Sequence, residues 1–151
     1  MKRSTRCDYS LRAVLELSFH YEKKLVRVSD LSDAQDIPLK FLEQIMLQLK
    51  KSGYVRSKKG PNGGYSLTKA PGDIFLGEII RLVDDRLFAP VLSEPMNRLT
   101  TLDAARDNFF GVWAEVEDAM ASVLDSISLA DIQKRQAEVL SKKKLNMVYH
   151  I

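Results

Sequence analysis

The chain has 151 residues, 45% of them hydrophobic and 28% charged, which excludes a disordered chain and allows one ordinary core plus an appended helix. The formal net charge is +3, no apolar run approaches the ~20 residues of a membrane span, and we see no signal segment. A single cysteine excludes an internal disulfide framework, so we expect a cytoplasmic protein without a membrane partner.

The first predicted helix covers Asp8 to Tyr21. Asp8 suits either its N-cap or its first turn, where an acid faces the positive end of the helix dipole. At helical spacing, the shared face of this helix carries Leu11, Val14, Leu15 and Ser18.

A short strand and a second helix are expected next. Residues 26–28, Val-Arg-Val, alternate like an edge strand. Ser29 would cap a helix over residues 30–35, with Leu31 and Ala34 turned inward. Residues 36–37 would form the turn that follows.

Residues 38–53 have a clear helical pattern. Pro38 suits a first helical turn, where a missing N–H costs nothing, and Gly53 suits the C-terminal end. One face is apolar and consists of Leu42, Ile45, Met46 and Leu49. The opposite face is polar and carries Lys40, Glu43, Gln44 and Lys51.

A β-hairpin is predicted after this helix, with strands at residues 54–57 and 65–67 and a Gly-Pro-Asn-Gly-Gly tip at residues 60–64. Asn-Gly is a strong hairpin signal, because a tight turn needs positive φ. The base of the tip is basic and contains Arg56, Lys58 and Lys59. A helix with a polar outer face followed by a basic hairpin is the layout of a winged helix-turn-helix.

A break at residues 69–72 leads into a buried helix predicted over Ile74 to Val83. Residues 84–101 contain two prolines and no clear periodicity, so we expect an irregular loop. The apolar residues of this loop could line an effector pocket or a docking surface, or fill the core, and they are Phe88, Val91, Leu92 and Met96.

From Asp103, apolar residues recur at intervals of four and three, at Phe109, Trp113, Val116, Met120, Val123 and Ile127. Such a heptad-like seam is typical of helices that pack along their length. It could be the core of a monomer or the contact between two subunits. Because a winged helix has its own core, we favour a homodimer. Ser128 would cap a short helix through Ile132, followed by a frayed tail.

The expected fold is therefore mainly α with a small β-hairpin wing: a winged helix-turn-helix DNA-binding domain and a long C-terminal dimerisation helix. We divide the chain into a winged-helix domain (1–70), a linking helix with an irregular loop (71–102), a dimerisation helix with the following short helix (103–135) and a tail (136–151).

The charge is unevenly divided along the chain. Residues 1–70 contain 14 basic and 7 acidic residues, whereas residues 71–151 contain 9 and 13. This division suggests that only the first half meets a polyanion.

The polar face of the 38–53 helix carries side chains that could contact DNA. Glu43 could accept a hydrogen bond from the amino group of cytosine, Gln44 could form two hydrogen bonds with adenine, and Lys51 would contact a phosphate. Leu47 on the same face could contact a thymine methyl group or pack on a neighbouring helix. Any solvated helix carries such residues, but the basic wing suits a minor groove, so we predict double-stranded DNA as the partner.

Six short segments occur in the order known from one protein family. They are Asp-Tyr-Ser-Leu-Arg-Ala at 8–13, Phe-Leu-Glu-Gln at 41–44, Leu-Lys-Lys-Ser-Gly at 49–53, Gly-Pro-Asn-Gly-Gly-Tyr-Ser-Leu at 60–67, Leu-Gly-Glu-Ile-Ile at 76–80 and Ile-Ser-Leu-Ala-Asp-Ile at 127–132. Through them the chain, to about residue 135, resembles the winged-helix regulators of the Rrf-two family.

The resemblance implies a homodimeric bacterial transcription factor on a palindromic operator, which we expect to be a repressor. By similarity, bases in the major groove would be read by Glu43 and Gln44, with Lys40 and Lys51 nearby. The minor-groove end of the wing would be formed by Lys59, Gly60 and Pro61, next to Lys58. Contacts with the DNA backbone would be supported by Tyr9 and Arg12. The helix from about Asp103 would be the dimer helix.

Many members of this family hold an iron–sulfur cluster with three cysteines in the loop before the dimer helix, and residues 84–101 contain none. Asp8 matches a cluster-ligating acid of some members, but one carboxylate without thiolates cannot hold a cluster. Two histidines are also too few for a metal set. We therefore expect neither an iron–sulfur cluster nor another metal.

Cys7 is the one candidate redox sensor, because the neighbouring Lys2, Arg3 and Arg6 would favour its thiolate. The alternative is a structural cysteine at a helix start. The cluster-free branch of the family includes regulators controlled by a partner protein or by thiol chemistry. A small effector that binds near the 84–101 loop is a further option.

No Ser-His-Asp set or paired-carboxylate motif is visible in the sequence, so we expect no enzyme. The alternative function is a protein-interaction module that keeps the winged fold without specific DNA binding. The acidic C-terminal half and the apolar residues of the 84–101 loop motivate that alternative.

Overall fold

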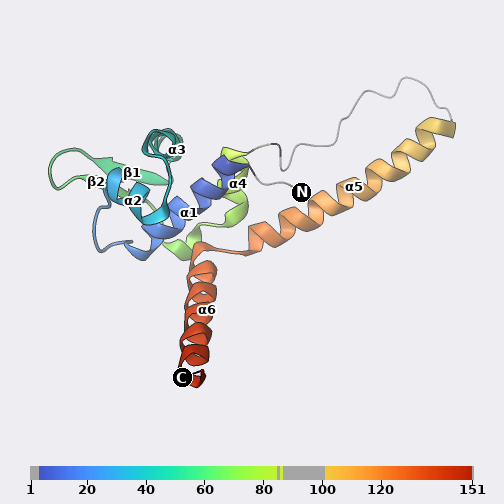
Figure 1. The fold of residues 1–151 in the computed structure, drawn as a ribbon. Helices are drawn as coiled ribbons and strands as arrows, with labels where there is room; N and C mark the ends of the chain where they lie inside the picture. The colour runs from blue at the N-terminus through green and yellow to red at the C-terminus, as the bar shows by residue number, and fades with distance from the viewer. Residues whose placement is uncertain (1–3, 85, 87–100, 151) are drawn as a thin grey trace.

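The computed structural model of the protein describes residues 4–84, 86 and 101–150. Its elements are, in order, α1 (Thr5–Phe19), α2 (Val28–Gln35), α3 (Leu39–Lys51), β1 (Val55–Lys58), β2 (Gly64–Leu67), the 3₁₀ turn η1 (Pro71–Asp73), α4 (Leu76–Val83), α5 (Thr101–Ser126) and α6 (Leu129–Tyr149). Figure 1 shows α1 to α4 and the hairpin gathered in one body, from which α5 and α6 extend in different directions. The mainly helical fold with a two-stranded wing confirms the predicted fold class.

The core of this body lies between α1, α2, α3, the hairpin and α4. All four apolar residues predicted for the buried face of α3 are fully buried. On α1 the burial differs from the prediction, because Ala13 and Leu17 lie in the core while Leu15 is only half-buried. Ala34 on α2 was expected to point inward, but it is exposed, and Ile37 in the following turn fills the core.

The helices α1 and α2 begin earlier than predicted. Ser4 caps α1, since its side-chain oxygen accepts from the Cys7 N–H at 3.1 Å, and Asp8 lies in the first turn. Ser29 lies inside α2, whose cap position is held by Arg27 without a side-chain hydrogen bond. The Cys7 N–H would have no partner inside the helix. Because the Ser4 hydroxyl accepts its hydrogen bond, the earlier start of α1 is favoured.

The hairpin is confirmed, and its antiparallel register places Lys58 opposite Gly64. The Gly63 N–H donates to the Gly60 carbonyl at 2.9 Å and closes the tip. A Cβ at Gly63 would lie 2.1 Å from the Lys58 carbonyl oxygen, so only glycine fits there. The strand predicted at residues 26–28 is reduced to a single bridge in which Val26 pairs with Tyr65.

The chain returns from α5 to the body next to the start of α4. The Leu76 N–H donates to the Ile127 carbonyl at 2.9 Å, and the Leu129 N–H donates to the Ile74 carbonyl at 2.9 Å. Leu129 is also buried in the same core as Ile74. These contacts fix the C-terminal end of α5 and the first turn of α6 to the winged-helix body.

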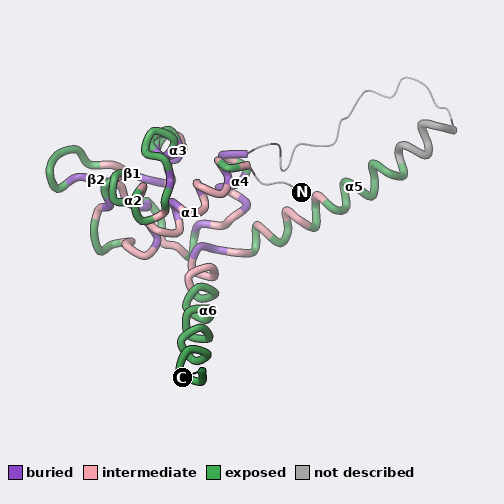
Figure 2. The backbone as a smooth tube through the Cα atoms, viewed as in Figure 1, coloured by how far each residue is buried: buried purple, intermediate pink, exposed green. Residues whose placement is uncertain are grey.

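The prediction of a short helix and a frayed tail after Ser128 is wrong. Ser128 does cap α6, since it accepts from the Asp131 N–H at 3.2 Å while Asp131 accepts from the Ser128 N–H at 2.9 Å. The helix then continues to Tyr149, and its outer part is exposed in Figure 2. Residues 133–149 contain no Gly or Pro and many strong helix formers, so their intrinsic helix propensity extends α6. The prediction failed because this stretch has no continuous apolar face that would indicate a helix.

Most of the loop expected at residues 84–101 lies outside the described residues, including the four apolar residues Phe88, Val91, Leu92 and Met96. None of the helices within the described ranges is long and apolar enough to span a membrane.

Candidate nucleic-acid interface

The helix α3 presents a polar surface, because burial of its apolar face turns the opposite side to solvent. We call this side the outer face of α3, and it consists of Lys40, Glu43, Gln44, Leu47 and Lys51, all of them exposed. Pro38 occupies the N-cap position rather than the first turn, and Gly53 follows the C-cap with φ of +79°. The side chains predicted to read bases therefore lie together on one rigid element.

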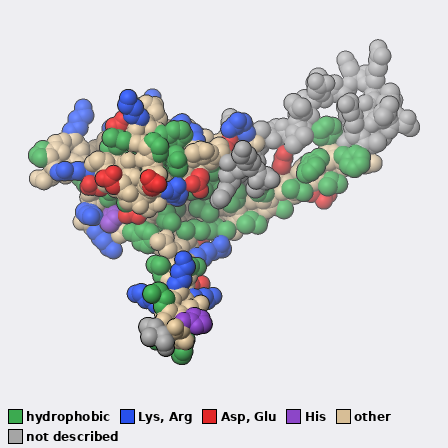
Figure 3. Space-filling model, viewed as in Figure 1, with side chains coloured by type: hydrophobic (Ala, Val, Ile, Leu, Met, Phe, Trp, Pro, Cys, Tyr) green, Lys and Arg blue, Asp and Glu red, His purple; other side chains and the backbone are tan. Residues whose placement is uncertain are grey.

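The wing is basic and is linked to the body at its tip and at its base. Lys58, Lys59, Gly60 and Pro61 are exposed. Arg27 donates to the Pro61 carbonyl, which ties the tip to the start of α2. Lys50 donates to the Ser57 hydroxyl at 2.6 Å, which ties α3 to β1. Figure 3 shows Lys and Arg side chains protruding around α3 and the hairpin, while Asp and Glu side chains gather over α2.

Arg56 also belongs to the wing, but its side chain is engaged across the hairpin. Its Nε donates to the Ser66 hydroxyl at 3.0 Å, in agreement with the strand register that pairs these two residues. The side chain of Arg56 is therefore held along the hairpin surface, whereas the two exposed lysines lie closer to the tip.

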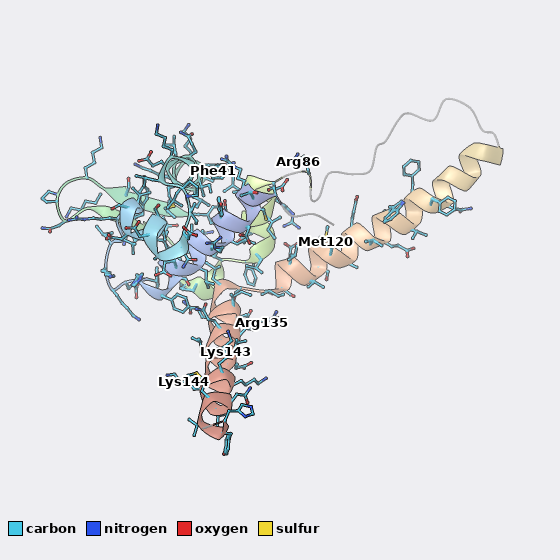
Figure 4. All side chains as sticks on the ribbon, in the orientation of Figure 1. Phe41, Arg86, Met120, Arg135, Lys143 and Lys144 are labelled. Atoms are coloured by element: carbon cyan, nitrogen blue, oxygen red, sulfur yellow. The ribbon has the colours of Figure 1, made fainter. Side chains whose placement is uncertain are left out.

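Tyr9 and Arg12 lie beside the N-terminal turn of α3. The Tyr9 ring meets Phe41 edge to face with 5.4 Å between centroids, and the Arg12 guanidinium lies 5.4 Å from the Tyr9 ring centre. An ion pair of 3.3 Å with Asp8 orients Arg12 further. Figure 4 labels Phe41 on α3, on the side of the molecule away from α6. The structure thus brings both α1 residues next to the helix that carries the outer face.

Gln48 links α3 to two other elements and was not predicted from the sequence. Its side-chain N–H donates to the Leu82 carbonyl at 2.7 Å, and its side-chain oxygen accepts from Arg6. The helix α3 is therefore connected to the C-terminal end of α4 and to the start of α1. Gln48 lies at the border between the apolar and polar faces, where periodicity gives no signal.

Cys7 lies away from the outer face of α3, in a small buried cluster with Ile80 and Val83. Its side chain is 1% exposed. Nearby, the buried carboxylate of Asp84 accepts a hydrogen bond from Ser4, which holds the pKa of Asp84 below its ordinary value. The reactivity proposed for Cys7 stays a prediction, and the thiol would need a local opening to meet an oxidant.

In the described part of the chain, the seam predicted from Phe109 to Ile127 is mostly exposed rather than packed in a core. Phe109, Trp113, Val116 and Val123 are between 50% and 70% exposed, and Met120 and Ile127 are half-buried. Figure 3 shows hydrophobic side chains along α5, beyond the winged-helix body. The apolar face of α5 is thus available to another molecule.

A helix-turn-helix with an exposed polar third helix, a basic wing and a long following helix defines a winged-helix DNA-binding protein. The chain matches the family model described as "Rrf2: Iron-dependent Transcriptional regulator" over residues 3–135. It therefore belongs to the Rrf-two family of DNA-binding transcriptional regulators.

Individual relatives agree with this assignment. The chain is 33% identical over 140 residues to the HTH-type transcriptional regulator IscR of Xenorhabdus nematophila, covering 93% of this chain and 83% of that protein. It is 31% identical over 150 residues to Protein rrf2 of Nitratidesulfovibrio vulgaris, covering 99% and 98% of the two chains. The family model and the IscR relative both describe transcriptional regulators, which confirms the expectation of a regulator rather than an enzyme.

Solved structures show the same fold. The structure of T. potens IscR matches with a TM-score of 0.72 and 30% identity, covering 92% of this chain and 90% of that chain. CymR, the global cysteine regulator of B. subtilis, matches with a TM-score of 0.74 and 27% identity, covering 89% and 98%.

The residues of this chain do not fit an iron–sulfur cluster, although the family description refers to iron. Such clusters are held by several thiolates, and the whole sequence contains one cysteine, which is buried in α1. Within the described ranges, no group of three or more His, Cys, Asp or Glu side chains could hold a metal ion.

Proposed function

We propose that the protein is a sequence-specific, homodimeric repressor that acts in the cytoplasm on a palindromic operator. Each subunit would insert α3 into a major groove and the wing into the adjacent minor groove. The observation that carries this proposal is the exposed outer face of α3 beside a basic wing, with both elements linked to one rigid body.

The roles of individual side chains follow from their chemistry. A carboxylate such as Glu43 accepts from the cytosine amino group, and an amide such as Gln44 can bond adenine with two hydrogen bonds. Lys40 and Lys51 flank these two and would meet phosphates or base edges. In the wing, Lys58 and Lys59 would lie along the minor groove, where Gly60 and Pro61 let the backbone approach closely. Tyr9 and Arg12 would contact the sugar-phosphate backbone.

The proposed dimer uses the seam of α5. Its exposed apolar residues lie at heptad spacing, which suits the same helix of a second subunit. A two-fold dimer would present its two recognition helices to half-sites about 34–36 Å apart, one turn of B-DNA, or a multiple of that distance.

We propose that regulation does not use an iron–sulfur cluster. The remaining signals are modification of Cys7 after a local opening, a small effector near the 84–101 loop, or a regulatory protein partner. Protein purified under strict anaerobic conditions should be colourless and free of iron, and a brown protein with stoichiometric iron would contradict this part of the proposal.

The alternative function is a protein-interaction module without specific DNA binding. Salt separates the two functions, because a protein that neutralises phosphates loses DNA affinity steeply as salt rises. A weak dependence of DNA affinity on salt would favour the module.

The proposal is tested by selecting bound fragments from the genomic DNA of the source organism at near-physiological salt. We expect enrichment of one palindromic motif upstream of a few operons. A variant with Gln44→Ala and Lys51→Ala should lose the enrichment, whereas Lys142→Ala and Lys143→Ala on α6 should keep it, since α6 extends away from α3 (Figure 4). No enrichment with folded wild-type protein would refute sequence-specific binding.

A further inference from the structure

The large hydrophobic residues that are exposed in the described winged-helix body occur on one element. In the described part of the chain before α5, the large hydrophobic side chains that are exposed are Leu39, Phe41 and Leu47, and all three belong to α3. Phe41 is accounted for by its ring contact with Tyr9. Leu39 lies at the first position of the helix. Leu47, 45% exposed, lies in the middle of the helix without such a contact.

The position of Leu47 on the helix is opposite to the core. At 100° per residue, its direction differs from the mean direction of the four buried residues of α3 by more than a right angle. Its neighbours one turn away are Glu43 and Gln44 on one side and Lys50 and Lys51 on the other. Leu47 is therefore surrounded by the side chains proposed to read bases and bind phosphates.

The charge around Leu47 indicates what covers it. Lys40, Lys50 and Lys51 lie around the leucine on the same helix, and Lys58 and Lys59 extend from the neighbouring wing. A polyanion with an apolar group between its phosphates matches this arrangement. In the major groove of DNA that group is the C5-methyl of thymine, which side chains contact through apolar atoms.

We propose that Leu47 determines specificity by packing against the C5-methyl group of one thymine in each operator half-site. The inference rests on the proposed function, in which α3 enters the major groove. It adds a contact that depends on a single methyl group and on neither charge nor hydrogen bonding.

Replacing thymine with deoxyuridine tests this directly, because it removes the methyl group and keeps base pairing. In the selected operator, symmetry-related thymine pairs are replaced one pair at a time, and dissociation constants are measured at one salt concentration for the wild type and Leu47→Ala. We expect one thymine pair at which replacement by deoxyuridine weakens binding by the wild type about fourfold per half-site. This factor corresponds to the hydrophobic free energy of burying one carbon group. Leu47→Ala should bind the thymine and deoxyuridine operators equally there.

Three results would overturn the proposal while leaving operator binding intact. The wild type could be insensitive at every thymine, or Leu47→Ala could keep the wild-type sensitivity. A change of oligomeric state in Leu47→Ala without a change in thymine preference would also overturn it, since it would mean that Leu47 packs on a second subunit. Leu39→Ala is the matched control and should keep the thymine preference. Failure to select any operator would instead refute the proposed function.

Discussion

Arg81 on α4 and Asp125 at the end of α5 form a two-pronged ion pair, with Nη1–Oδ1 and Nη2–Oδ2 distances of 2.6 and 2.8 Å. The two side chains are 42% and 45% exposed, so solvent screens the pair and it adds little stability. A two-pronged contact nevertheless fixes orientation. Together with the backbone contacts of Leu76 and Leu129, it sets the direction in which α5 leaves the body.

Gly77 tests this junction, because a Cβ there would lie 1.9 Å from the Asp125 Oδ1 atom. Gly77 is the second residue of α4. Gly77→Ala should displace the carboxylate and break the pair, and this loss offsets the gain, smaller than the ~1 kcal/mol of a helix interior, that alanine brings over glycine. In an Asp125→Ala background the same substitution should be stabilising. Urea unfolding of the four proteins measures the coupling, and additive free energies would show that the pair and Gly77 are independent.

Acid should weaken the same region. The hydrogen bond from Arg81 holds the pKa of Asp125 below its ordinary value of 3.8, and the backbone N–H and hydroxyl of Ser128 lower the pKa of Asp131. A carboxyl with a lower pKa in the folded chain binds fewer protons there than in the unfolded chain. This stabilisation is complete above about pH 5 and is lost as the pH falls through the folded pKa.

The measurement for this second prediction is the free energy of unfolding between pH 7 and pH 3. The wild type should lose more stability below pH 4 than Asp125→Asn does. Parallel curves for the two proteins would mean that the ion pair does not contribute to acid sensitivity.

The seam of α5 predicts the oligomeric state. Val116→Glu places a charge among apolar residues that we assign to the dimer contact, so it should give monomers in sedimentation experiments. Operator affinity should fall by about a hundredfold or more, because two linked half-site contacts are lost. Ser122→Glu, an exposed position away from the seam on the same helix, is the control and should stay dimeric. A dimeric Val116→Glu protein would place the subunit contact elsewhere.

The burial of Cys7 predicts slow thiol chemistry. Labelling by a water-soluble disulfide reagent should be at least about tenfold slower in the folded protein than in urea, since even a local opening of about 1.4 kcal/mol reduces the reactive population tenfold. Equal rates would show that the α1 start opens freely and would favour the redox-sensor role.

The elements that the sequence predicted well depend on local patterns. The four buried residues of α3 follow from their spacing alone, and the hairpin follows from Asn62-Gly63 between two short β-type runs. The outer face of α3 was then predictable as the remainder of the same helix.

The features that the sequence did not predict depend on contacts between residues far apart in the chain, or on local preferences too weak to select one structure. Arg27 meets Pro61 and Gln48 meets Leu82 across 34 positions, and no periodicity encodes either contact. Ser4 and Asp8 are both good residues for a helix start, so the sequence left the first turn of α1 undecided. α6 has no continuous apolar face, and its length comes from intrinsic propensity.

We propose that the outer face of α3 reads DNA sequence. This role is tested by the ratio of affinities for the selected operator and for a scrambled duplex at near-physiological salt. We predict a ratio of at least about 10³ for the wild type. Glu43→Ala should change the preferred base at one position, at a cost of about 1–3 kcal/mol in discrimination. Lys59→Ala should weaken both duplexes alike and flatten the salt dependence. A ratio near one, or an unchanged base preference in Glu43→Ala, would show that the outer face of α3 does not read sequence.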